Sequence, residues 1–530
     1  MTRAALVCLG AWVMAAGLAN AQNTEALRAE PARFDDPARL ERLAAAFPEI
    51  DRLFQAYGAE AHVPGMVWGI VVDGQLVHQG AVGQRDVASG APVDRQTVFR
   101  IASMTKSFTA LAILKLRDDG KLLLDHPVER YVPELAFLVY PTADAPRITI
   151  RHLLTHSAGF PEDNPWGDQQ LAITEGAMTA LLRQGVPFSN PPGLAYEYSN
   201  FGFAILGRIV SETSGMPYRD YVQRAILAPL GMRATTLEAA DVPLDRLALG
   251  YRWEDASWKL EPALADGAFG AMGGMLTSID DLGRYVAFLL SAWPPRDDED
   301  TGPVRRASIR EMQQVWRMGR ASVAGGASDT PVRLSAGGYG YGLRVTQTCD
   351  IDHLVGHAGG LPGYGSLMLW LPAHGVGLVA AGNLTYTSWG PRFDAALAAL
   401  AATGALRPRA PQPSPALTSA RAAVSRLVAA WDDDLADEIA ADNLYLDRSK
   451  DRRRREFAAL RQRHGTCRTD VPFDAENALR GTWTMPCERG AVRVAITLSP
   501  TVPPRVQYLS TVSFDSLPPR VNARACAPAQ

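Results

Sequence analysis

Apolar positions over residues 37–402 follow helical and strand spacings in turn. Helical spacing over 37–57 precedes two alternating runs at 66–72 and 75–82, which Asp73-Gly74 joins. Recurrence every three or four positions predicts a helix, and alternation on both sides of an Asp-Gly pair predicts a tight hairpin. By the same criteria we expect further helices at 103–119, 148–157, 203–213, 279–290 and 394–402, and further strands at 335–346, 353–357, 366–371 and 375–382.

A change of pattern after residue 405 marks a second region. Prolines recur over 406–416, which predicts a semi-rigid, extended linker. Beyond it, apolar residues take helical spacing over 424–439 and alternate over 492–512. We therefore expect a large α/β domain at 22–405 and a separate, small α+β domain at 417–530. The second domain contains no nucleophile with a base at a useful spacing. The sequence does not indicate its role, and any partner of this domain is unknown.

Length and charge agree with this division. A chain of 530 residues exceeds what one core normally supports, so two domains are expected. The net charge of −3 gives no reason to expect nucleic-acid binding. The one basic run, at 452–455, lies among acidic residues and is interpreted as a solvated helix face.

The first residues have the pattern of a secretory signal peptide. Arg3 precedes an apolar run at 4–18, and Ala19-Asn20-Ala21 fits the small-residue cleavage pattern. We expect cleavage of residues 1–21 and export to the periplasm or the medium, with an uncleaved anchor as the alternative. No later segment is long and apolar enough to span a bilayer, so no membrane span is expected after cleavage.

Four cysteines follow the predicted signal segment, an even number that permits disulfides in an exported protein. Cys467 and Cys487 lie on either side of two predicted strands, and we favour a bridge between them. Cys349 and Cys526 would then tie the tail to the first domain. Metal binding is the alternative, but no Cys-x-x-Cys motif supports it, and we expect neither a metal nor a cofactor.

The strongest chemical signal is a serine followed three residues later by a lysine, Ser103 and Lys106. Residues at i and i+3 of a helix lie on one face, so the lysine can reach the serine hydroxyl. A serine needs a nearby base to act as a nucleophile, and lysine, unlike arginine, can lose its proton. Only five of the 53 basic residues are lysines, which makes this one notable. The alternative is an exposed helix lysine after an N-capping serine.

Two later motifs give this pair a context. Together the three stretches resemble the serine β-lactamase and penicillin-binding protein superfamily, over about residues 35–405. The second motif, with tyrosine in first place, is similar to that of the class C branch, which also includes D,D-peptidases, D-aminopeptidases and esterases. The resemblance implies an antiparallel sheet flanked by helices, with a helical subdomain beside it. The three stretches are Ser103-x-x-Lys106, Tyr198-x-Asn200 and His357-x-Gly359.

The same resemblance implies the roles of these residues. Ser103 is expected to form an acyl-enzyme, while Lys106 and Tyr198 move its proton. Which of the two is the resting base is left open. Asn200 is expected to hold either the substrate amide or the lysine. The backbone amides of Ser103 and Gly360 are expected to stabilise the oxyanion.

The third motif departs from the Lys-Thr-Gly of most β-lactamases, because His357 and Ala358 precede Gly359. A histidine is charged only part of the time near neutral pH, and alanine lacks the threonine hydroxyl. Both changes weaken the anchoring of an anionic substrate at this substrate-binding position, so an efficient β-lactamase is disfavoured. The alternative is that His357 only ends a strand.

Four further residues near the motifs have side chains that could take part in chemistry or substrate binding. His152 and His156 are interpreted as packed structural histidines, since no carboxylate or thiol motif accompanies them. Tyr196 lacks an asparagine two residues later and is interpreted as packing. Trp166 either lines the substrate cleft or packs within its loop.

The sequence thus predicts an exported serine hydrolase that acts on an amide or ester of a small-molecule or peptide substrate. A D-amino-acid peptide, a peptidoglycan-type peptide and a small ester are the candidate substrates. The alternatives are a β-lactamase proper and a penicillin-binding sensor that is acylated once without turnover.

Overall fold

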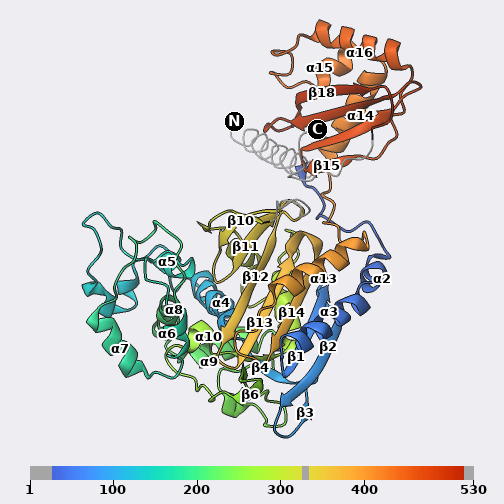
Figure 1. Ribbon diagram of the computed structural model, residues 1–530. Helices are drawn as coiled ribbons and strands as arrows, with labels where there is room; N and C mark the ends of the chain where they lie inside the picture. Colours follow the sequence, from blue (N-terminus) through green and yellow to red (C-terminus); the bar gives the residue numbers. More distant parts are fainter. Residues whose placement is uncertain (1–26, 325–332, 519–530) are drawn as a thin grey trace, which may run out of the picture. The chain divides into compact units, whose positions relative to one another are not determined.

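The computed structural model describes residues 27–324 and 333–518, and it consists of two compact units (Figure 1). One unit spans residues 36–408. The other combines residues 27–35 with residues 409–518. The predicted signal segment 1–21 and Cys526, and with it the expected Cys349–Cys526 pair, lie outside the described residues.

A single antiparallel sheet organises the larger unit. Its strands follow the order β3-β2-β1-β14-β13-β12-β11-β10-β8, and β9 (Ser322–Ala324) pairs with β10. Segments from the two ends of the unit therefore meet at its centre, where β1 pairs with β14. The strands are β1 (Gly65–Val72), β2 (Gln75–Asp86), β3 (Ala91–Pro92), β8 (Arg317–Met318), β10 (Arg333–Tyr339), β11 (Arg344–Thr348), β12 (Leu354–Leu361), β13 (Tyr364–Leu371) and β14 (Val376–Gly382).

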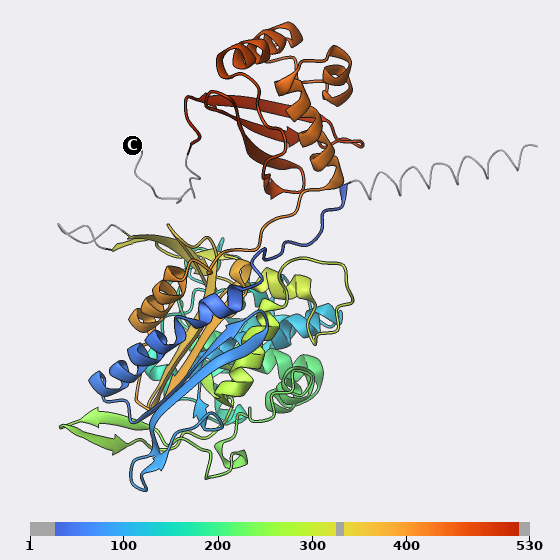
Figure 2. The same cartoon turned by 90° about the vertical axis from the view of Figure 1, so that its right-hand side faces the viewer.

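Helices cover both faces of this sheet, as the turned view in Figure 2 shows. On one face lie α2 (Arg39–Ala44), α3 (Phe47–Glu60) and α13 (Gly390–Ala402), and on the other lie α4 (Thr105–Asp118) and α11 (Ile279–Leu290). Eleven of the fourteen residues of α4 are buried, so this helix is enclosed on all sides. A helix that is apolar all round belongs in the interior. The helix that follows Ser103 is therefore the central element of the unit.

A helical subdomain contacts the far side of α4 (Figure 1). Its longest helix, α8, begins at Asn200, three residues before the start that we predicted. Ser199 caps this helix by accepting a hydrogen bond from the amide of Gly202, and Gly215 ends it in the left-handed conformation. The subdomain contains α5 (Ile150–Leu154), α6 (Asn164–Asp168), α7 (Glu175–Gln184), α8 (Asn200–Ser214), α9 (Tyr218–Val222) and α10 (Gly270–Gly273).

The predicted fold class is confirmed, with one local correction. The single strand expected at 335–346 is two strands, β10 and β11, because Gly340, Tyr341 and Gly342 form a turn between them. Gly342 takes a φ of +66°, which only glycine adopts readily. This turn brings Arg344 to the start of β11.

The smaller unit is a four-stranded antiparallel sheet with three helices. Helix α14 begins at Pro415, inside the segment 406–416 that we predicted as linker. Ahead of it, the backbone of Ala410 pairs with that of Arg33. The strands, in order, are β15 (Asp474–Asn477), β16 (Arg480–Pro486), β17 (Ala491–Leu498) and β18 (Val506–Phe514), and the helices are α14 (Pro415–Ala429), α15 (Asp433–Ile439) and α16 (Lys450–His464).

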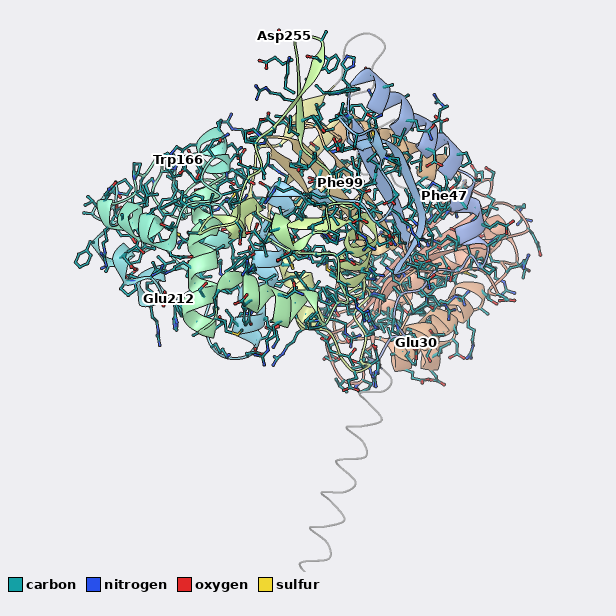
Figure 3. The ribbon with its side chains drawn as sticks, turned by 90° about the horizontal axis from the view of Figure 1, so that it is seen from below. Glu30, Phe47, Phe99, Trp166, Glu212 and Asp255 are labelled. Carbon is teal, nitrogen blue, oxygen red and sulfur yellow. A yellow bond between two sulfur atoms is a disulfide. The ribbon has the colours of Figure 1, made fainter. Side chains whose placement is uncertain are left out.

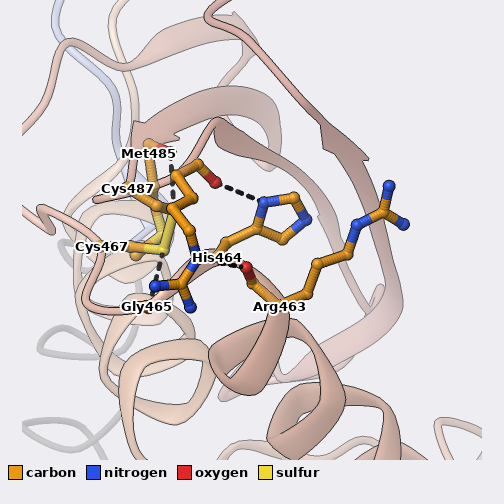
Figure 4. Close-up of a disulfide and its surroundings, with 7 residues drawn as sticks. Arg463, His464, Gly465, Cys467, Met485 and Cys487 are labelled. Carbon is orange, nitrogen blue, oxygen red and sulfur yellow. Dashed lines mark hydrogen bonds between the residues drawn. A yellow bond between two sulfur atoms is a disulfide. The ribbon is translucent and has the colours of Figure 1, made fainter.

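The predicted disulfide between Cys467 and Cys487 is present in this unit (Figure 4). The two residues form an antiparallel bridge that joins the segment after α16 to the end of β16. The cross-link limits the freedom of the unfolded chain between residues 20 positions apart.

Replacing both Cys467 and Cys487 by alanine should lower the stability of this unit by about 2–4 kcal/mol. Hydrogen exchange followed by mass spectrometry should show faster exchange in β16 and β17. Strands β1 and β14 of the larger unit are the internal control and should be unaffected. Equal exchange in wild type and variant would contradict a stabilising role for the bridge.

Candidate active site

Ser103 lies in a 3₁₀ turn, Ala102–Met104, that leads directly into α4. Ala102 has a φ of +49°, in the left-handed region that non-glycine residues rarely adopt, so the chain bends sharply just before the serine. Ser103 keeps 8% of its surface exposed, whereas Ala102 and Met104 are fully buried. The hydroxyl therefore sits at the amino end of the central helix, where the partial positive charge of the helix favours a developing anion.

Lys106 is fully buried directly beside this hydroxyl. Its Nζ lies 3.0 Å from Ser103 Oγ, 2.7 Å from Asn200 Oδ1 and 2.7 Å from the carbonyl oxygen of Met272 in α10. Burial lowers the pKa of Lys106 to about 7, although the charges of Asp168 and Asp163 oppose the shift. Near neutral pH a large fraction of Lys106 is thus an uncharged amine, which can accept a proton.

Tyr198 approaches the serine as well. Its hydroxyl is hydrogen-bonded to Ser103, and Lys106 Nζ lies 4.9 Å from the centre of its ring. Burial raises the pKa of Tyr198 above its ordinary value. The sequence left open which of the two groups is the resting base. The opposite pKa shifts favour a neutral phenol at Tyr198 and, at Lys106, an amine that can accept a proton near neutral pH.

The position of Asn200 depends on an aspartate that sequence reasoning missed. The carboxylate of Asp163 accepts hydrogen bonds from the backbone amides of Asn200 and Phe201, at 2.7 and 2.8 Å, and thereby caps α8. This cap directs Asn200 Oδ1 to Lys106, while Nδ2 donates to Asn164 at 3.2 Å. Of the two roles expected for Asn200, the structure shows the contact with the lysine.

The glycines of the third motif allow β12 to pack directly on the serine turn. A Cβ added to Gly359 would lie 2.1 Å from the carbonyl oxygen of Ile101, a distance at which atoms overlap. Ser366 of β13 donates a hydrogen bond to the same carbonyl at 2.8 Å. Gly359 thus sets the distance between the sheet and Ser103.

The backbone of Gly360 faces the open edge of β12. This strand pairs with β11 only through Leu354–Gly356, whereas it pairs with β13 as far as Leu361. Leu361 and Tyr364 are partners across a two-residue turn, and backbone groups point alternately to the two sides of a strand. The amide of Gly360 therefore points away from β13, as the expected second oxyanion donor must.

His357 differs from what its sequence position suggested. We expected a histidine that is charged part of the time, but the side chain is 3% exposed and burial holds its pKa well below the ordinary value. Nδ1 donates to the carbonyl oxygen of Ala358 at 2.6 Å, and Nε2 accepts from the hydroxyl of Tyr339 at 2.7 Å. Both ring nitrogens are occupied, so His357 supplies no cation to a substrate.

Arg344 places a positive charge close to the three motifs. It is exposed at the start of β11 and is paired with Gly356, next to His357. Its charge acts on Lys106, Tyr198 and His357. Among the described residues no carboxylate forms an ion pair with it. Sequence reasoning missed Arg344 because it placed this residue inside one long strand.

A tyrosine and an aspartate border the site near Gly360. The ring of Tyr386 lies 2.7 Å from where a Cβ on Gly360 would be, and its hydroxyl donates to Asp168 at 2.8 Å. Tyr386 has a φ of +52°, and burial raises the pKa of Asp168 to about 6. No motif pointed to either residue.

Trp166, His152 and Tyr196 lie near the motifs and pack against neighbouring elements. Trp166, labelled in Figure 3, is 46% exposed and packs against the rings of Phe201 and Phe269. His152 belongs to the capping box of α5. Tyr196 is half-buried, with its ring 5.8 Å from that of Tyr339.

The described residues show neither a metal-binding cluster nor a helix suited to span a membrane. No three or more histidine, cysteine, aspartate or glutamate side chains gather as they would around a metal ion. No helix in the same ranges has the length and apolar character needed to cross a membrane.

Comparisons with known proteins agree with this geometry. Residues 50–403 match the family described as Beta-lactamase. The chain is 25% identical over 348 residues to "Penicillin-binding protein 4*" of Bacillus subtilis (strain 168), covering 63% of this chain and 71% of that protein. It is 28% identical over 344 residues to "Protein flp" of Staphylococcus aureus (strain MW2), and spans 63% of that protein's length as well as 63% of its own.

A solved structure shows the same fold. The octameric penicillin-binding protein homologue from Pyrococcus abyssi superimposes with a TM-score of 0.57 at 23% identity, covering 88% of this chain and 96% of that one. The class C-like branch that we expected is not distinguished by these matches. The family match extends over two thirds of the sequence and contains all three motifs, and the chain therefore belongs to the beta-lactamase family, in the superfamily shared with penicillin-binding proteins.

Proposed function

We propose that the protein is a serine hydrolase that cleaves an amide or ester through an acyl-enzyme on Ser103. The observation that carries this proposal is the contact between Lys106 Nζ and Ser103 Oγ, 3.0 Å apart, at a lysine whose pKa burial lowers to about 7. A nucleophile within hydrogen-bond reach of a base that is poised near neutral pH is what acyl transfer requires.

Acylation follows from the positions of three side chains. Neutral Lys106 takes the proton of Ser103 as its oxygen attacks the carbonyl carbon, and the amides of Ser103 and Gly360 stabilise the resulting oxyanion. Tyr198 gives its proton to the leaving amine or alkoxide as the scissile bond breaks. Tyr198 then regains a proton from Lys106, so the base is neutral again.

Deacylation uses the same groups. A water molecule replaces the leaving group, and Lys106 accepts its proton as the water attacks the ester. Tyr198 gives its proton to the oxygen of Ser103 as that oxygen leaves, and then regains one from Lys106. Because the same base serves both steps, loss of Lys106 would prevent turnover rather than trap an acyl-enzyme.

The substrate that we propose carries a carboxylate near the scissile bond. Arg344 is an exposed cation at the open edge of β12 without an ionic partner among the described residues. The guanidinium group can bind a carboxylate with two parallel hydrogen bonds. In this proposal Arg344 anchors the substrate carboxylate, the role that the sequence had suggested for His357. A carboxylate-binding site favours peptides ending in a D-amino acid over neutral esters.

Export remains part of the proposal. Disulfides form and persist mainly in oxidising compartments, and the bridge between Cys467 and Cys487 agrees with the signal pattern at 1–21.

A substrate panel tests the proposal directly. Nitrocefin, a p-nitrophenyl ester, a D-Ala-D-Ala peptide and a D-amino-acid amide are offered to the wild type, and intact mass spectrometry follows the protein. We expect an acyl adduct on Ser103 and steady turnover with at least one substrate, and faster turnover of the peptide than of nitrocefin. A stoichiometric burst without turnover would favour the sensor alternative, and absence of any adduct would rule out acyl transfer.

Arg344→Gln should raise KM for carboxylate-bearing substrates about ten- to hundred-fold. This factor corresponds to the binding free energy that one hydrogen bond to a charged group contributes. Hydrolysis of the neutral ester should be unchanged. Arg95→Gln, at another exposed arginine far along the sequence, is the matched control and should change neither. Equal effects of Arg344→Gln on charged and neutral substrates would contradict the anchoring role.

A further inference from the structure

His156 follows α5 in a backbone conformation that requires support from its surroundings. Its φ is +52°, and its side chain is only 2% exposed. Left-handed residues other than glycine cost free energy and are found where the surrounding structure fixes them, often at functional sites. The proposed mechanism gives no role to His156.

Two hydrogen bonds join His156 to the residues on either side of Tyr198. The carbonyl oxygen of His156 accepts from the amide of Glu197 at 2.8 Å, and Nδ1 accepts from the amide of Ser199 at 3.1 Å. The imidazole ring also lies against the phenol ring of Tyr198, with 4.3 Å between the ring centres. His156 thus binds the backbone on both sides of Tyr198 and also packs against the Tyr198 ring.

These contacts determine the tautomer of His156. A backbone amide can only donate, so Nδ1 must carry a lone pair and the proton of the neutral ring must be on Nε2. Burial lowers the pKa of His156 well below its ordinary value, and the charge of Arg344 acts in the same direction, as do Lys106 and His357 whenever they are protonated. The phenol groups of Tyr196, Tyr198 and Tyr339 also surround the ring. Burial and the charge of Arg344 therefore favour the neutral form of His156, which accepts from the amide of Ser199.

The ring also connects the second motif to the third. Its centre lies 4.5 Å from that of Tyr339, whose hydroxyl donates to His357 Nε2. His357 in turn donates to the carbonyl oxygen of Ala358, next to Gly359.

We propose that His156 is a positioning residue, which fixes the hydroxyl of Tyr198 beside Ser103 through the hydrogen bond from the Ser199 amide and the contact between the two rings. The inference rests on the proposed function, in which Tyr198 protonates the leaving group. If His156 acts through Tyr198, a variant that lacks the His156 side chain must show the same kinetic defect as a variant that lacks the Tyr198 hydroxyl. A general weakening of the fold would give a different defect.

Three variants separate the hydrogen bond from packing and from backbone strain. His156→Asn keeps an acceptor oxygen at the position of Nδ1 and tolerates a left-handed backbone. His156→Leu has a similar size without an acceptor. His156→Gly has neither side chain nor strain, and added imidazole can occupy the vacated space. Tyr198→Phe, which keeps the ring and loses the hydroxyl, is the reference for the catalytic defect.

The readout is kcat on two substrates with different leaving groups. An amide nitrogen must be protonated to leave, whereas p-nitrophenolate leaves without a proton. We expect His156→Leu and His156→Gly to lower kcat for the amide about 10²-fold, as misplacement of a catalytic group does, with KM within about threefold. The same variants and Tyr198→Phe should lower kcat for the p-nitrophenyl ester much less. His156→Asn, or imidazole added to His156→Gly, should restore most of the amide activity.

Several outcomes would overturn the inference. Equal losses on the amide and the ester would indicate a structural role only. An asparagine variant that folds, by circular dichroism, and is as impaired as the leucine variant would show that the acceptor does not matter. Wild-type protein without an acyl adduct would instead refute the proposed function, so the two failures are distinguishable.

Discussion

Ser103→Ala should lower kcat by about 10⁴- to 10⁶-fold on every substrate that the wild type cleaves, which is the loss seen when a nucleophile is removed. The serine oxygen forms the covalent bond in the proposed mechanism, and alanine has no atom that can replace it. The fold should be intact, because the serine is at the rim of the buried turn and the change removes one atom. Turnover of the best panel substrate measures the loss of kcat, and circular dichroism measures whether the fold is intact.

Ser107→Ala is the matched control for this variant. Ser107 lies one turn further along the same helix, where its hydroxyl donates to the carbonyl oxygen of Met104 and accepts from the hydroxyl of Tyr285. Its loss should cost about 1–3 kcal/mol of stability, because the buried phenol of Tyr285 loses its partner, and kcat should change only a few-fold. Retention of more than about one hundredth of the activity in pure Ser103→Ala would refute the assignment of the nucleophile.

Lys106→Met should lower kcat/KM by about 10²- to 10⁴-fold, the usual contribution of a general base. Methionine fills a similar volume but cannot accept the proton of Ser103. Lys106→Arg is the matched variant that keeps the positive charge, and it should be equally inactive because arginine holds its proton at all accessible pH values. If Lys106→Arg kept more than about a tenth of the wild-type kcat/KM, the positive charge alone would account for the role of Lys106 in catalysis.

The pH dependence provides a second measurement of the same residue. The neutral amine is the active form, so log kcat/KM of the wild type should rise with unit slope below about pH 7 and level off above it. The pKa of Lys106 falls from its ordinary value of 10.5 to about 7 on folding, so the unfolded chain binds more protons in that interval. The free energy of unfolding should therefore rise with pH between about 7 and 10.5, and Lys106→Met should lose this contribution.

The central features of the fold and site are of the kind that a sequence encodes locally. Helical spacing identified the helix that begins just after Ser103 and carries Lys106, and a separation of three residues was enough to place the two side chains in contact. The bridge between Cys467 and Cys487 was predicted correctly, although residues 474–477, which were expected to join two strands, form strand β15. Each of these features depends on residues close together in the chain or on a strong periodic pattern.

The remaining features depend on tertiary contacts between distant segments. Asp163 caps α8 from 37 residues away, and Tyr386 donates a hydrogen bond to Asp168 from 218 residues away. No local sequence pattern predicts either contact. His357 was expected to be charged part of the time, whereas burial and the hydrogen bond from Tyr339 keep it neutral. The type of a residue is visible in the sequence, whereas its solvation is a property of the folded chain.

The strained backbone of the site has a consequence for how this protein can change. Ala102, His156 and Tyr386 all have positive φ, and each such position costs on the order of 1–3 kcal/mol that the rest of the unit must offset. Substitutions that relax these positions are therefore expected to raise melting temperature while lowering turnover. Selection for thermal robustness alone would act against the geometry around Ser103, and selection for rate would keep the protein below the stability that its core permits.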